Sequence, residues 1–157
     1  MQFTLRAATP ADLFLIVKQR HAMFEAMGYV NRAQLELTDA KFEEWVEPKL
    51  ASGEYRGWFL QDESGRVVAG AGLWIMEWVP HALDQSTVRG NILNVYCEPS
   101  YQTLGLTRQL LVEVLDYCRD NGIRTLIANP SDAMRPVYDA LGFRPTAEVK
   151  IQVSVPN

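Results

Sequence analysis

Apolar residues in the first part of the chain recur with the spacing of a strand and then of a helix. Residues 3–7 alternate weakly and predict a first strand. Thr9-Pro10-Ala11-Asp12 is typical of a helix start, with a hydroxyl cap, a proline in the first turn and an acid at the third position. The helix is expected to end at Gly28, and its apolar face holds Leu13, Ile16, Val17, Phe24 and Met27.

A second helix is expected from Thr38, and two strands should follow it. Pro48 is expected to kink or shorten this helix, because proline removes an internal hydrogen bond. The strands are predicted over Trp58–Gln61 and Val67–Trp78, with residues 62–65 as the hairpin turn between them. The apolar stripe of the second helix consists of Phe42, Trp45, Val46 and Leu50.

The rest of the chain continues with strands and helices in alternation. A polar loop is expected over residues 79–90 and a strand over 91–98, followed by a short loop and a long helix that Asn121-Gly122 closes. The buried stripe of that helix should be Leu106, Leu110, Leu111, Val114, Leu115 and Cys118. The last elements are expected to be a strand over 124–128, a helix over 134–141 and alternating terminal strands over 143–155.

The predicted order is β-α-α-β-β-β-α-β-α-β, which is typical of an α/β (α+β) fold with a mixed sheet and helices on both its faces. Residues 1–157 contain no repeat, linker or low-complexity segment, so we expect a single domain. Apolar content of 48% and charged content of 22% are ordinary for a globular protein with a sizeable core.

Charge and cysteine content narrow the class of function. A net charge of −4 without a run of Lys or Arg argues against a nucleic-acid binder, and no apolar stretch is long enough to span a membrane. The N-terminus lacks the layout of a signal peptide. Cys97 and Cys118 form no CxxC pair, and the two histidines show no metal spacing. We therefore expect a cytoplasmic protein without a metal site.

Residues 91–107, NILNVYCEPSYQTLGLT, carry the main chemical signal. A strand that leads through a loop into a helix makes an anion site, because first-turn N–H groups lack partners and the helix dipole is positive there. The pattern predicts a phosphate-bearing ligand held mainly by backbone. The lysine of a P-loop is absent, and Gly70-Ala71-Gly72 lacks the third glycine of a dinucleotide fingerprint and lies within a strand pattern.

Two segments resemble hallmarks of the GNAT N-acetyltransferase superfamily. Residues 94–107 are similar to its acetyl-CoA signature, a strand, a proline and then Arg/Gln-x-x-Gly-x-Gly/Ala at a helix start. Residues 138–143, YDALGF, are similar to its Tyr-x-x-x-Gly-Phe motif. Gln102 replaces the common Arg, Thr107 is bulkier than Gly or Ala, and Ser131 stands where Asn is frequent. The resemblance implies a mostly antiparallel sheet and acetyl transfer from acetyl-CoA to a primary amine, by direct transfer through a ternary complex.

The resemblance also assigns roles to residues of this chain. The backbone from Thr103 to Arg108 should hold the CoA pyrophosphate, and the strand from Val95 to Cys97 should pair with pantetheine. Tyr138 is expected to protonate the leaving thiolate. The full set expected to bind the cosubstrate is Val95, Tyr96, Cys97, Gln102, Thr103, Leu104, Gly105, Leu106, Thr107, Arg108 and Ser131.

Several functional questions stay open at the level of sequence. Glu77 is the first choice as general base, with Asp84, Glu98 and Glu36 as alternatives, and Cys97 with His21 or His81 is a weaker nucleophilic alternative. The acceptor pocket should come from residues 20–37 and 79–90, but the sequence does not identify the amine. A non-catalytic acyl-CoA sensor is the rival function, and a homodimer is an assembly that the sequence allows. Acceptor-pocket candidates are Arg20, Phe24, Met27, Tyr29, Trp45, Trp74, Trp78 and His81.

Overall fold

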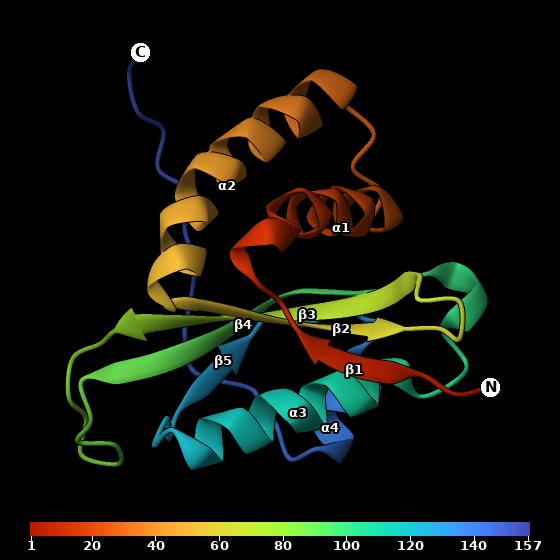
Figure 1. Ribbon diagram of the computed structural model, residues 1–157. Helices are drawn as coiled ribbons and strands as arrows, with labels where there is room; N and C mark the ends of the chain where they lie inside the picture. Colours follow the sequence, from red (N-terminus) through yellow and green to blue (C-terminus); the bar gives the residue numbers. More distant parts are fainter.

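The computed structural model describes residues 1–157 and contains one five-stranded sheet (Figure 1). The strands lie side by side in chain order, and every neighbouring pair is antiparallel except the last, which is parallel. The chain therefore meanders through four strands and crosses over once, through a helix, to reach the fifth. The strands are β1 (Thr4–Ala7), β2 (Tyr55–Gln61), β3 (Val67–Glu77), β4 (Val88–Cys97) and β5 (Leu126–Ala128).

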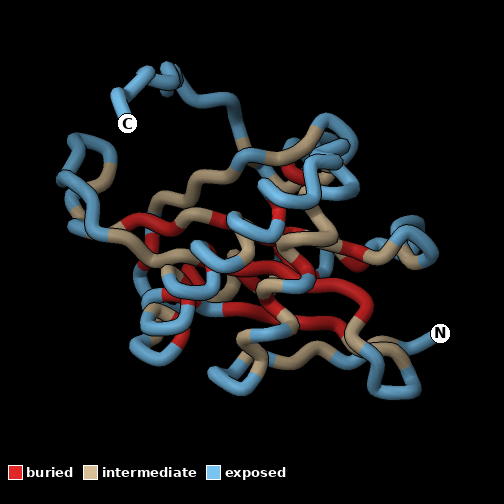
Figure 2. The backbone as a smooth tube through the Cα atoms, turned by 90° about the horizontal axis from the view of Figure 1, so that it is seen from above, coloured by how far each residue is buried: buried red, intermediate tan, exposed pale blue.

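Helices cover both faces of the sheet, as the sequence predicts (Figure 1). The helices α1 (Leu13–Ala26) and α2 (Arg32–Ser52) lie on one face, and α3 (Leu106–Asp120) and α4 (Arg135–Ala140) lie on the other. Short 3₁₀ turns, η1 (Pro10–Asp12) and η2 (Pro99–Tyr101), precede α1 and α3. Buried residues form a continuous band through the sheet (Figure 2). The larger cluster lies on the α3 side and the smaller one under α1 and α2.

Local signals account for most of these elements. Thr9 and Asp12 form the expected capping box, and the Arg6 guanidinium also binds the Asp12 carboxylate at 2.8 Å. The predicted apolar face of α3 is buried, with only Leu115 partly exposed. Residues 62–65 form the hairpin turn, because the Asp62 carboxylate accepts hydrogen bonds from the backbone N–H groups of Ser64 and Arg66.

The second helix is longer at its start than the sequence predicts. It begins at Arg32 and not at Thr38, because the Asn31 side chain accepts a hydrogen bond from the Gln34 N–H and caps it. Pro48 does not end this helix, which continues to Ser52. Tertiary packing of its buried face, from Leu35 to Leu50, outweighs the lost hydrogen bond.

The terminal strands predicted over residues 143–155 are wrong. The chain beyond α4 has no strand pairing and extends away from the sheet (Figure 1). Phe143 still packs against the core, and the Arg89–Glu148 ion pair at 3.0 Å ties the following residues to β4. The alternating apolar residues from Val149 onward are exposed. Alternation describes the side chains of a strand, but a strand also requires a neighbour for its backbone hydrogen bonds.

Candidate functional site

A cleft opens where β4 separates from β5. The two strands pair only between Gly90–Ile92 and Leu126–Ala128, so the rest of β4 has no strand neighbour on that side. The cleft has a volume of about 1010 Å³ and is lined by α1, α2, β4, the start of α3 and α4. The free edge of β4 presents backbone hydrogen-bonding groups that an extended ligand can pair with, in the manner of an added strand.

A bulge at Asn94 shapes the floor of the cleft. Gly70 and Gly72 on β3 face Tyr96 and Leu93 on β4, so β4 carries one extra residue between these pairs. Asn94 takes a φ of 58°, and it is the only residue other than glycine in the left-handed region. Such a conformation is uncommon and persists where surrounding contacts fix it.

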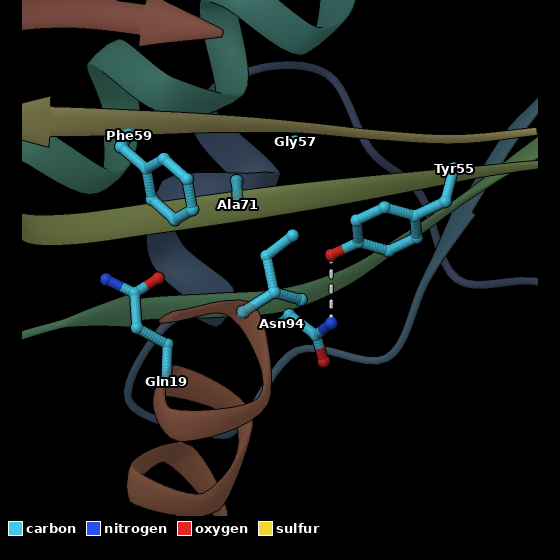
Figure 3. Close-up of a pocket in the computed structure, with 7 residues that line it drawn as sticks. Gln19, Tyr55, Gly57, Phe59, Ala71 and Asn94 are labelled. Carbon is cyan, nitrogen blue, oxygen red and sulfur yellow. Dashed lines mark hydrogen bonds between the residues drawn. The ribbon is translucent and has the colours of Figure 1, made fainter. Parts of the chain in front are cut away.

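Two side chains hold Asn94 in this conformation. Arg20 Nη1 on α1 donates to Asn94 Oδ1 at 2.6 Å. Asn94 Nδ2 donates to the Tyr55 hydroxyl at 2.9 Å, as Figure 3 shows. Gly72 makes room for Tyr55, because a Cβ at that position would overlap the phenol oxygen. Burial raises the pKa of Tyr55 to about 12, so the hydroxyl is neutral at physiological pH.

The loop after β4 forms an anion cradle. Gln102 Nε2 donates to the Cys97 carbonyl at 3.2 Å and thereby ties the loop to the strand. Gly105 caps α3 with a φ of 74°, and the N–H groups of the first helical turn follow it. A glycine suits this position because it adopts the left-handed region without strain. These N–H groups and the helix dipole make the start of α3 suitable for a phosphate ligand.

Most of the predicted cosubstrate residues line the cleft, and four predicted site residues do not. Thr103 and Leu104 are exposed on the loop, Leu106 is buried in the core, and Glu77 is exposed at the end of β3. The predicted residues that do line the cleft are Val95, Tyr96, Cys97, Gln102, Gly105, Thr107, Arg108, Ser131 and Tyr138.

Tyr138 and Cys97 differ in what they can do chemically. Tyr138 lines the cleft from α4, and its ring packs edge-on against Phe143 with centroids 5.1 Å apart. Burial raises the pKa of Tyr138, so its hydroxyl keeps its proton and can donate it. Burial also raises the pKa of Cys97, to about 11, and no histidine lines the cleft beside it. The nucleophilic alternative for Cys97 therefore has no geometric basis.

The carboxylates considered as bases are engaged elsewhere. Asp84 accepts hydrogen bonds from Ser86 and Thr125, Glu98 pairs with Arg66, and Glu36 pairs with Arg32. No aspartate or glutamate lines the cleft, whereas the side chains of Arg20, Lys41 and Arg108 do. The cleft thus offers positive charge and hydrogen-bond donors but no carboxylate base.

Only some of the residues expected to form an acceptor pocket line the cleft. Tyr29, Trp78 and His81 lie outside it, whereas Arg20, Phe24, Met27, Trp45 and Trp74 line it. Sequence reasoning missed Asn94, which lines the cleft, and Tyr55, which binds its side chain. The available signal was one polar residue, Asn94, inside the apolar run from Ile92 to Cys97.

No helix combines the length and the apolar character that crossing a membrane requires. No group of three or more His, Cys, Asp or Glu side chains is placed to hold a metal ion.

Comparisons with known proteins agree with this geometry. The model of the acetyltransferase (GNAT) family matches residues 19–143. A GCN5-related N-acetyltransferase from Ralstonia eutropha JMP134 is 31% identical, with a TM-score of 0.90 over 97% of this chain and 99% of that one. A predicted acetyltransferase of Clostridium acetobutylicum, solved with acetyl-CoA, has the same fold, with a TM-score of 0.88, 22% identity and coverage of 97% and 96%.

A relative of known activity is also similar in sequence. The glucosamine 6-phosphate N-acetyltransferase of Trypanosoma brucei brucei is 27% identical over 120 residues, which are 76% of this chain and 79% of that protein. The family match spans the strand, the anion cradle and the tyrosine that form the cleft. The chain belongs to the acetyltransferase (GNAT) family and is an acyltransferase.

Proposed function

We propose that this acyltransferase moves an acetyl group from acetyl-CoA to a primary amine, by direct transfer within a ternary complex. The observation that carries the proposal is the separation of β4 from β5 beside the anion cradle at the start of α3. One cleft therefore offers a strand edge for an extended thioester arm and a helix N-terminus for its phosphates.

The residues present fit acetyl-CoA. The backbone from Thr103 to Arg108 would hold the pyrophosphate, with Gly105 leaving open space where a Cβ would point. The edge of β4 from Val95 to Cys97 would pair with the pantetheine amides. Ser131 lines the cleft next to α4 and would add a hydroxyl hydrogen bond.

The chemistry requires stabilisation of an oxyanion and a proton for the thiolate. The amine nitrogen would form a bond to the thioester carbon while the carbonyl electron pair moves onto oxygen. A backbone N–H of the bulged strand near Val95 would stabilise that oxyanion. The oxyanion then reforms the carbonyl as the C–S bond breaks, and the sulfur takes the proton of the Tyr138 hydroxyl, which is buried and lines the cleft. The tyrosine would regain a proton from water before the next turnover.

The proton of the incoming amine needs a different route. Glu77, predicted as the base, is exposed at the end of β3 and does not line the cleft. We therefore propose that the amine reacts as the free base and that water removes its proton. The rate should then follow the ionisation of the amine itself.

The test is a CoA-release assay over a panel of amines. The panel should include glucosamine 6-phosphate, because the Trypanosoma relative bears that substrate in its name, together with amino acids, aminoglycosides and peptides. Release of CoA with one acetylated product supports the proposal. Tight binding of acetyl-CoA without transfer to any amine would favour the rival function, an acyl-CoA sensor.

We also propose that the protein forms a homodimer through its C-terminal segment. Apolar side chains at alternate positions of this segment are exposed, which is the pattern of a strand that lacks its neighbour. They are Val149, Ile151, Val153 and Val155. A second copy would supply the neighbour by pairing the two segments or by accepting the segment at a sheet edge.

A cytoplasmic location is part of the same proposal. Cys97 and Cys118 are both free and buried, which suits a reducing compartment. We propose neither a nucleic-acid nor a membrane partner, since the chain is acidic and its cleft fits a small thioester and an amine.

A further inference from the structure

Arg20 is a half-buried cation without a counter-ion. Its Nη1 donates to Asn94 Oδ1, a neutral amide oxygen, and its Nε is buried without a hydrogen-bond partner. The guanidinium lies over the rings of Phe24 and Phe42, with its central carbon 4.8 and 4.6 Å from their centroids. No carboxylate forms an ion pair with the Arg20 guanidinium. Arg20 lines the cleft beside the bulge at Asn94.

Arg89 also has a buried Nε without a hydrogen-bond partner, but among the arginines only Arg20 is withdrawn from water without a carboxylate partner. The partly or fully buried guanidinium groups of Arg6 and Arg89 are paired with Asp12 and Glu148. Every remaining arginine that lacks a carboxylate partner is exposed to water. Burying a charge is unfavourable unless an opposite charge or several hydrogen bonds compensate for the lost hydration.

The surroundings of Arg20 offer no internal partner. Burial lowers the pKa of Arg20, yet an arginine stays charged at physiological pH. The nearby carboxylate of Asp39 is 2.7 Å from His21 Nδ1 and is engaged there. Lys41 lines the same side of the cleft, and no acidic residue lines any part of it. Asp39 therefore offsets the Arg20 charge only from a distance, and the cleft side of the guanidinium has no carboxylate partner.

We propose that the acceptor amine carries an oxyanion, a carboxylate or a phosphate, that binds the Arg20 guanidinium. This inference rests on the proposed function and names the substrate class of the same site. Arg20 contacts Asn94, the residue before Val95, where we place the reacting carbonyl. An anion on Arg20 would hold an amine only a few bonds away next to that carbonyl, so the acceptor is a small amino acid or amino phosphate.

The first experiment compares matched amines that differ only in the oxyanion. One pair is an α-amino acid and its amide, and another is glucosamine 6-phosphate and glucosamine. We expect kcat/KM to favour the anionic member of at least one pair by about 10- to 100-fold, the range of one charge-assisted hydrogen-bonded pair. The pair that shows the preference distinguishes a carboxylate from a phosphate. Equal rates for both members of every pair would overturn the inference.

Substitution assigns the preference to one side chain. Arg20→Gln should abolish the preference while the KM for acetyl-CoA stays at the wild-type value, and Arg20→Lys should restore part of it. The matched control is Arg32→Gln, which removes the same charge from an exposed side chain of α2 outside the cleft. If Arg20→Gln instead lowers the rates of charged and neutral amines equally and raises the KM for acetyl-CoA, Arg20 only positions Asn94 and the inference fails.

A binding experiment separates this inference from the proposed function. Inorganic phosphate and acetate are titrated calorimetrically into the wild-type protein saturated with CoA. Arg20-dependent binding, lost in Arg20→Gln and kept in Arg32→Gln, supports the anion site even if no amine on the panel is acetylated. Transfer to neutral amines without any binding of either anion would sustain the proposed function and overturn the anion site.

Discussion

Replacement of Gly105 by glutamate tests where the pyrophosphate of CoA binds, and Gly122 offers a matched control. Both glycines flank α3 in the left-handed region, with φ of 74° and 70°, and an added Cβ would meet no atom within 4 Å at either position. Any side chain there therefore strains the backbone to a similar extent, about 1–2 kcal/mol. Only Gly105 lines the cleft.

The expected magnitude follows from simple electrostatics. A carboxylate roughly 6 Å from a pyrophosphate with about two charges is repelled by about 1.4 kcal/mol at the dielectric constant of water, or about tenfold in Kd. A new acid at the N-terminus of α3 interacts favourably with the helix dipole, whereas one at its C-terminus does not. Gly105→Glu should thus be the more stable variant and yet the weaker binder.

The assay is calorimetric titration of acetyl-CoA into both variants, with thermal unfolding as the control for folding. Gly122→Glu should bind acetyl-CoA like the wild type, and Gly105→Glu should bind at least about tenfold more weakly. Acetyl-CoA should also raise the Tm of Gly122→Glu more than that of Gly105→Glu. Equal affinities in the two folded variants would refute the placement of the pyrophosphate at the start of α3.

Other measurements test the remaining assignments. Tyr138→Phe should lower kcat at least tenfold, as loss of a positioned acid typically does, without changing the KM for acetyl-CoA; wild-type turnover across the pH range would make the residue a packing residue. Because burial raises the pKa of Cys97 to about 11, iodoacetamide at pH 7.5 should leave the folded enzyme active, and rapid inactivation would contradict this. Arg6 lowers the pKa of Asp12, so their pair stabilises the fold above the ordinary carboxylate pKa and loses this effect as the pH falls through the lowered value. Arg6→Gln should lower Tm at pH 7 and flatten its fall below about pH 4. Deletion of residues 147–157 should leave a monomer by light scattering, and an unchanged dimer mass would place the interface elsewhere.

The anion cradle and the strand before it could be predicted from the sequence because their determinants are local. An apolar strand, a glycine-containing loop and an amphipathic helix follow one another within residues 91–120, and backbone N–H groups bind a phosphate whatever the neighbouring side chains are. The order of strands and helices was also predictable, since hydrophobic periodicity alternates clearly from one segment to the next. The two main errors of the sequence-based prediction were the terminal strands over 143–155 and the start of α2. A strand depends on pairing with a neighbour, and the start of a helix depends on its cap.

The surroundings of Asn94 were decided by the tertiary structure. Arg20 and Tyr55 reach Asn94 across 74 and 39 residues of chain, and no periodicity reports contacts over such separations. The bulge at Asn94 arises from the register between β3 and β4, which is a property of two strands and not of one. Whether a carboxylate faces the cleft likewise depends on how whole elements pack. The sequence by itself determined the backbone donors of the anion cradle, and packing alone determined which charged side chains line the cleft.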